Sequence, residues 1–292
     1  MKRISNYLLV LFVSMAILAG GISNVKAGEF SAGATVMYGW WKPFLANYLQ
    51  QLDRKMPIKT SFKMNMDSVL YAPMLGYKIS DTWNISFILL MALHNQFSAS
   101  SSNATLDLTG LNLARSTTSH INKYDADLRA NHAINKYASI FIAVNAETDT
   151  YFGGYNAIVT FAPIIPITLP TKGSLRSFQY DCGPGAGVDL KFELVKNFYA
   201  QIKLSLYVMA GKLTRNIQYS TRKETINMAF KSIDEVIFSY YIESARATVS
   251  IGGRYHAMTF ALMKATPTEH FKNYTTLFDQ MGGITASVAF VF

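Results

Sequence analysis

The chain has 292 residues and a formal net charge of +9, with 50% hydrophobic and only 15% charged residues. This charged fraction lies well below the roughly 25% usual for soluble domains, which excludes a highly solvated, disordered or coiled-coil protein. Beyond the first twenty residues, no apolar run approaches the ~18 residues that a membrane-spanning helix needs. The hydrophobic half of the chain must therefore lie in strands or in an ordinary core.

The first segment predicts a secretory signal peptide. Lys2 and Arg3 precede an apolar stretch at 8–19, and Val25-Lys26-Ala27 supplies a small-x-Ala cleavage pattern. We therefore expect residues 1–27 to be removed after Ala27, leaving one domain at 28–292. Cleavage removes Lys2, Arg3 and Lys26, which lowers the net charge from +9 to +6.

Cys182 is the only cysteine of the chain. It cannot form a disulfide within the chain, and a lone thiol provides no metal or redox motif. We interpret it as a small apolar strand residue.

Most of the remaining sequence alternates between apolar and polar residues with a period of two. The last eleven residues are the clearest case, with Ile284, Val288 and Phe290 on one face and Thr285 and Ser287 on the other. The pattern predicts ten strands at 29–41, 67–79, 84–96, 121–132, 137–147, 180–193, 198–211, 241–254, 257–264 and 279–292. A further hairpin inside 155–175 would raise the count to twelve, and fusion of weak elements would lower it to eight.

Short polar turns alternate with long connections, and aromatic residues gather at the predicted strand ends. The predicted turns are 80–82, 133–136, 195–197 and about 254–257. The predicted long connections are 42–66, 97–120, 147–179, 212–240 and 264–278. Within them, the spacing of apolar residues suggests a short amphipathic helix at 43–57 and a second one at about 225–238.

Two segments carry a resemblance to a known family. The hairpin Gly76–Phe87 resembles the periplasmic hairpins of the Gram-negative outer-membrane β-barrel superfamily, and the closing Ala289-Phe290-Val291-Phe292 is similar to its C-terminal assembly signal. The resemblance implies an all-β, antiparallel, up-and-down transmembrane barrel in the bacterial outer membrane. It also implies contact with lipopolysaccharide, and recognition of Phe290 and Phe292 by the barrel-assembly machinery. A soluble β-sandwich shows the same alternation and stays open as an alternative.

Polar residues on the inward faces of a barrel this small should fill a narrow lumen. The residues expected to line it are Lys123, Asp125, Asp127, Arg129, Asp189, Lys191, Lys203 and Arg246. Opposite charges confined together should pair, because an unpaired buried charge is unfavourable. The two interpretations are a structural ion network and a narrow, weakly selective pore.

Candidate catalytic groups are few. Asp125-x-Asp127 places two carboxylates about 6–7 Å apart on one strand face. Surface proteases of the omptin type also use paired acids, but at the extracellular rim and with an Asp-His partner, and no Asp-x-His occurs here. His94 and His120 near Ser98–Ser102 could serve a hydrolase or acyltransferase at the outer rim, although no third orienting residue is evident. No catalytic, cofactor or metal site is expected.

We therefore expect a non-enzymatic outer-membrane barrel with a narrow or plugged lumen, acting in small-solute or ion passage or in surface structure. The alternatives are an outer-membrane enzyme acting on lipid or peptide, and an adhesin that binds through 97–120, 147–179 and 212–240. Basic residues are dispersed, which argues against nucleic acid as a partner. A monomer or small oligomer is expected.

Overall fold

A computed structural model describes residues 29–42, 66–92, 97–99, 111–161, 168–217, 220–265 and 277–292, and the far ends of the longest strands by their backbone alone. The predicted signal peptide at 1–27, the predicted helix at 43–57 and His94 lie outside these residues. The strands are β1 Phe30–Lys42, β2 Met66–Lys78, β3 Trp83–Met91, β4 Phe97–Ala99, β5 Leu111–Ala133, β6 Ala138–Phe161, β7 Thr168–Val195, β8 Phe198–Ile217, β9 Ser220–Ile242, β10 Ala247–Ala265 and β11 Leu277–Val291. Among the described residues, no helix has the length and apolar character needed to cross a membrane.

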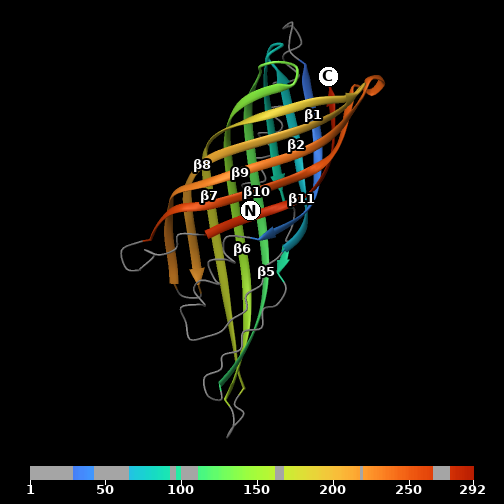
Figure 1. Ribbon diagram of the computed structural model, residues 1–292. Coiled ribbons are helices and arrows are strands. Elements are labelled where there is room, and N and C mark those ends of the chain that lie inside the picture. Colours follow the sequence, from blue (N-terminus) through green and yellow to red (C-terminus); the bar gives the residue numbers. More distant parts are fainter. Residues whose placement is uncertain are drawn as a thin grey trace.

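The strands form one closed antiparallel sheet (Figure 1). β1 pairs with β2 on one side and with β11 on the other, where the register runs from Ser31↔Val291 to Lys42↔Gln280. β3 and the short β4 pair in succession with β5, so they occupy one position in the wall. The described part of the wall therefore has ten strand positions, and the predicted ten-stranded up-and-down barrel is confirmed.

The count of ten is right although two of the predicted strands are wrong. The structure has a strand, β9, where a long connection and an amphipathic helix were expected, and it has one continuous strand, β10, where two strands and a turn at 254–257 were expected. Apolar residues 226, 230, 233 and 237 happen to satisfy helical spacing. Gly252 lies within the continuous strand β10 and does not form a turn. A glycine fits there because the neighbouring strand comes close: a Cβ at this position would lie 2.3 Å from the carbonyl oxygen of Val236.

The predicted long connections 97–120, 147–179 and 212–240 are also too long. β5 begins at Leu111, β6 continues to Phe161 and β7 starts at Thr168. The extra hairpin considered within 155–175 is the far end of the β6–β7 pair, which runs to Thr160↔Thr168. Segments such as 114–119 are polar on both faces, so period-two alternation gives no signal although the ladder continues.

The chain reverses through short turns at one end of the barrel, hereafter the turn end, opposite the far end. Asn135 Oδ1 accepts hydrogen bonds from the backbone N–H groups of Tyr137 and Ala138 at 2.8 and 2.9 Å. Asn197 has a φ of 65°, and its side-chain amide donates to Glu243 in the adjacent turn at 2.8 Å. That hydrogen bond, together with the nearby Lys196, lowers the pKa of Glu243.

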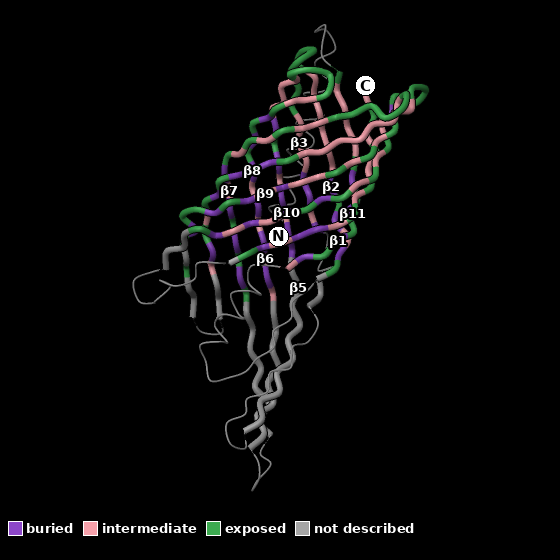
Figure 2. The backbone as a smooth tube through the Cα atoms, viewed as in Figure 1, coloured by how far each residue is buried: buried purple, intermediate pink, exposed green. Residues whose placement is uncertain are grey.

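The two faces of the wall differ in chemistry. Purple and green alternate along the strands of the wall in Figure 2, because inward side chains are buried while outward ones are exposed. The outward positions form an apolar belt that includes Ile142, Val144, Leu206, Ile251 and Ile284. A belt of this kind is the lipid-facing feature of transmembrane barrels.

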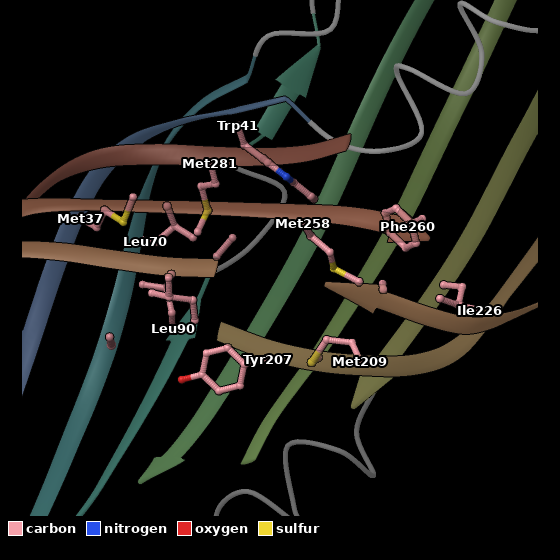
Figure 3. Close-up of a cluster of buried hydrophobic side chains, with 14 of the residues drawn as sticks. Met37, Trp41, Leu70, Leu90, Tyr207, Met209, Ile226, Met258, Phe260 and Met281 are labelled. Atoms are coloured by element: carbon pink, nitrogen blue, oxygen red, sulfur yellow. The ribbon is translucent and has the colours of Figure 1, made fainter. Parts of the chain in front are cut away.

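Inside, one part of the lumen is filled by apolar side chains. Met37, Leu70, Leu90, Met258 and Met281 are almost fully buried and belong to one hydrophobic cluster. Figure 3 shows these side chains projecting from several strands into the same interior space, together with Tyr207, Met209 and Phe260. Flexible thioether side chains suit such an irregular interior. The remainder of the lumen is polar, with buried charged side chains from β5, β6, β7, β9, β10 and β11.

Candidate functional site

The polar wall of the lumen results from alternation on adjacent strands. On β5, positions 123, 125, 127 and 129 face inward, and on β6 the odd positions from 141 to 151 do the same. The ladder places Asp125 opposite Glu147 and Lys123 opposite Asp149. One like-charged pair, one oppositely charged pair and several further cations therefore meet inside the barrel, and they form two clusters at different depths.

The turn-end cluster consists of Asp127, Arg129, Lys203, Tyr207, Glu235 and Arg254. Asp127 accepts a hydrogen bond from Arg129 Nε at 2.7 Å and from the Tyr207 hydroxyl at 3.0 Å. Arg254 Nη1 donates to Glu235 at 2.6 Å, whereas the half-buried Lys203 lies 3.8 Å from that carboxylate. Each acid here thus has its own arginine.

A cavity of about 200 Å³ adjoins this cluster. Arg129, Lys203 and Arg254 line it from one side, and Ser31 and Met74 from the other. This space is large enough for several waters. This cavity lies near the turn end, beside the paired charges.

The far cluster is organised around two lysines. Lys231 Nζ lies 2.6 Å from Glu147, 3.1 Å from Asp125 and 2.8 Å from the side-chain oxygen of Asn145. Lys123 binds Glu147 and lies 3.2 Å from Asp149, and its ammonium is 4.6 Å from the centroid of the Trp41 ring. Both lysines are fully buried, so their charges depend on these partners.

More acids lie near the far cluster. Gln179 donates to Asp181 at 2.6 Å, and the Trp41 indole N–H donates to Asp279 at 2.8 Å. Both carboxylates are almost fully buried. With Asp125, Glu147 and Asp149, this part of the lumen holds five acids against two lysines.

One group in the far cluster has the composition of a metal site. Atoms of Asp125, Glu147 and His256 lie within 4.8 Å of one another, and both ring nitrogens of His256 lack a hydrogen-bond partner. However, the ammonium of Lys231 already contacts both carboxylates. A bound cation would have to lie against that ammonium, so the geometry favours the lysine as the counter-ion.

The eight residues expected to line the lumen are distributed unevenly. Lys123, Asp125, Asp127 and Arg129 are buried inside the barrel. Asp189 is half-buried and accepts from Gln201 at 2.6 Å, and Lys191 is exposed at the turn end with its ammonium 4.1 Å from the Tyr199 ring centroid. Arg246 is misassigned: it is exposed in the turn after η1 (Glu243–Ala245), with a φ of 45°. The error follows from starting the strand at 241 rather than at Ala247.

Several central residues were missed by sequence reasoning, namely Glu147, Asp149, Lys231, Glu235, Arg254, His256 and Asp279. For Glu147 and Asp149 a signal existed, because the odd-position polar pattern of β6 continues past 147. For Lys231 and Glu235 the alternation of polar and apolar residues was obscured. The inward Ile233 separates these two residues, and the outward Asp234 adjoins Glu235. Mixed polarity on both faces of β9 removed the alternation.

The two candidate catalytic carboxylates do not form an accessible site. Asp125 and Asp127 are 1% exposed, and both accept hydrogen bonds from lumen side chains. The side chain of His120 lies outside the described residues, as does His94. No third member of a rim site can be assigned from the described residues.

No protein-family model matches the chain, and no curated protein sequence matches it. Among solved structures, the outer membrane protease OmpT from Escherichia coli is similar over 92% of this chain and 99% of its own, with a TM-score of 0.55 and 9% identity. The translocator domain of the autotransporter NalP from Neisseria meningitidis matches over 100% and 98%, with a TM-score of 0.36 and 8% identity. The likeness to OmpT shows a shared antiparallel β-barrel fold.

Proposed function

We propose that this chain is a non-enzymatic protein of the bacterial outer membrane, with a closed lumen and a surface-structural role. The apolar belt supports membrane placement, with the turn end toward the periplasm as in asymmetric barrels. The observation that carries the proposal is the interior itself. Apolar side chains and the far cluster together fill the barrel above the turn-end cavity.

The lengths of three strands support a role beyond the far end. About 9–11 residues suffice for a tilted strand to cross a bilayer, whereas β5, β6 and β7 have 23, 24 and 28 residues. In Figure 1 they continue as an antiparallel ribbon past the remaining strands. The last ten residues of β6, 152–161, extend the ribbon by about 33 Å at about 3.3 Å per residue. A rigid, filled barrel is a suitable base for such a ribbon.

The experiment is single-channel recording in planar bilayers. We expect the folded protein to give no current steps in potassium chloride, because the fully buried Lys123 and Lys231 block the path. A double variant, Lys231→Ala with Tyr207→Ala, removes two large lumen side chains and should introduce small steps. Regular current steps from the unmodified protein would overturn the closed-lumen proposal.

Deletion of the ribbon is the corresponding test of the surface role. Replacing 152–175 by a two-residue turn should leave the heat-modifiable, folded barrel intact on electrophoresis, because the clusters and the belt are unchanged. Loss of folding in this variant would mean that the ribbon is needed to build the barrel rather than carried by it.

A further inference from the structure

A carboxylate points outward from the wall among apolar side chains. Asp234 belongs to a lateral row of the sheet, in the order Trp40, Gly282, Tyr255, Asp234 and Leu204, set by the registers of β1, β11, β10, β9 and β8. Trp40, Tyr255 and Leu204 are exposed on the outer face. Asp234 is half-buried and makes no hydrogen bond or ion pair with any residue that the structure describes. The lumen acids described above, in contrast, all have partners.

The wall is hollowed beside this carboxylate. A depression of about 390 Å³ lies over Gly253, with Trp40, Leu204, Val236 and Tyr255 among its lining residues. A Cβ added to Gly253 would meet nothing nearer than the carbonyl oxygen of Gly283 at 3.8 Å, so the floor is open. At Gly282 a Cβ would lie 3.1 Å from the Trp40 ring, which shows that this ring lies over the glycine. The depression is thus a glycine-floored groove with aromatic rims.

The aromatic rims also indicate the depth of the groove. The rings of Trp40 and Tyr255 have centroids 6.3 Å apart. Trp and Tyr on the outside of a barrel mark the boundary between hydrocarbon and head groups. Asp234 therefore lies where a lipid head group can reach it, while Gly253 and Val236, in the next row toward the turn end, adjoin acyl chains.

The chemistry of the groove selects an organic cation. A carboxylate without a partner at the edge of an apolar belt is stabilised by a positive charge, and adjacent Trp and Tyr rings attract ammonium groups through their π faces. A single carboxylate offers too few oxygen ligands for a divalent metal ion. We propose that this groove binds an ammonium-bearing membrane lipid, with its ammonium on Asp234 and its methylenes over Gly253.

A lipid fits the groove better than a strand of another protein does. Two projecting aromatic rings border the depression, so a flat strand would rest on the rings, whereas a flexible amphiphile can enter between them. This inference rests on the proposed membrane placement. Flotation of the protein with vesicles tests that placement separately.

The test uses quenching of tryptophan fluorescence by bromine, because Trp40 forms part of the groove. The full chain is reconstituted in phosphatidylglycerol vesicles that contain increasing fractions of brominated phosphatidylethanolamine, brominated phosphatidylglycerol or brominated diacylglycerol. We expect half-maximal quenching at a several-fold lower fraction of the ethanolamine lipid than of the other two. Diacylglycerol is uncharged, so the Asp234 carboxylate does not repel it as it repels phosphatidylglycerol. A preference for phosphatidylethanolamine over diacylglycerol therefore shows recognition of the ammonium group.

Two variants and a matched control complete the experiment. Asp234→Asn and Gly253→Leu should each abolish the preference for phosphatidylethanolamine, the first by removing the charge and the second by filling the floor. Ala186→Leu places the same leucine side chain on the outward face of β7, outside the residues that line the groove, and should retain the preference. Equal quenching by the three lipids in a protein that floats with vesicles, or an unchanged preference in Asp234→Asn, would overturn the site. Failure to float would overturn the membrane placement as well.

Discussion

The two charged clusters of the lumen neutralise their buried carboxylates in different ways. In the turn-end cluster, each carboxylate has its own arginine, Asp127 with Arg129 and Glu235 with Arg254, next to a cavity. In the far cluster, two fully buried lysines each contact more than one acid. An arginine fork satisfies one carboxylate in a fixed geometry, whereas an ammonium is a compact charge that several acceptors can share. A substitution in the turn-end cluster should therefore lower the free energy of unfolding little, whereas loss of a shared lysine in the far cluster should lower it strongly.

The largest expected effect follows from removing a shared lysine. Lys231→Met leaves Asp125 without its nearest cation and Glu147 with Lys123 alone. Breaking a buried ion pair from one side costs about 3–5 kcal/mol. The free energy of unfolding can be measured by urea titration in detergent micelles. Lys203→Met is the control, because Glu235 keeps Arg254 at 2.6 Å, and it should cost about 1 kcal/mol or less. Similar losses from both variants would remove the distinction between the clusters.

An intermediate effect is expected in the turn-end cluster. Tyr207→Phe removes the hydroxyl that donates to Asp127 at 3.0 Å, but Arg129 stays bonded to the carboxylate. A hydrogen bond to a charged group contributes about 1.5–3 kcal/mol, and we expect the lower part of this range. Tyr240→Phe, on the exposed outer face, should change the same urea midpoint little. A loss as large as that of Lys231→Met would show that Asp127 depends on Tyr207 rather than on its arginine.

The smallest effect should come from His256, although it lies in the far cluster. Its ring nitrogens have no hydrogen-bond partner, and Nε2 is 3.7 Å from Glu147. Replacing a buried polar group that has no partner by an apolar one is nearly neutral, so His256→Leu should change the free energy of unfolding at pH 7.5 by less than about 1 kcal/mol. A loss of several kcal/mol that grows toward pH 6 would instead indicate a protonated histidine paired with Glu147.

Sequence patterns predicted the strands of the barrel wall better than the side-chain contacts inside the lumen. The run from Lys123 to Arg129 alternates without interruption, so both the strand and its inward charges could be recognised. On β9 the sequence Ile233-Asp234-Glu235 places acids on both faces, and the same feature that concealed the strand produces the outward carboxylate of the groove. Partners across the lumen, such as Tyr207 and Asp127, are 80 positions apart, and only the closed register brings them together.

Closure of the wall also constrains the order of assembly. β1 and β11 pair along twelve positions, and the backbone N–H of Phe292 donates to the carbonyl of Phe30 at 2.8 Å. A chain in which only the strands up to β10 have formed would therefore carry two open edges, and exposed edges of apolar strands promote aggregation. Because such long-range pairing forms slowly, the nascent protein should depend on a chaperone that shields both edges until the last strand arrives.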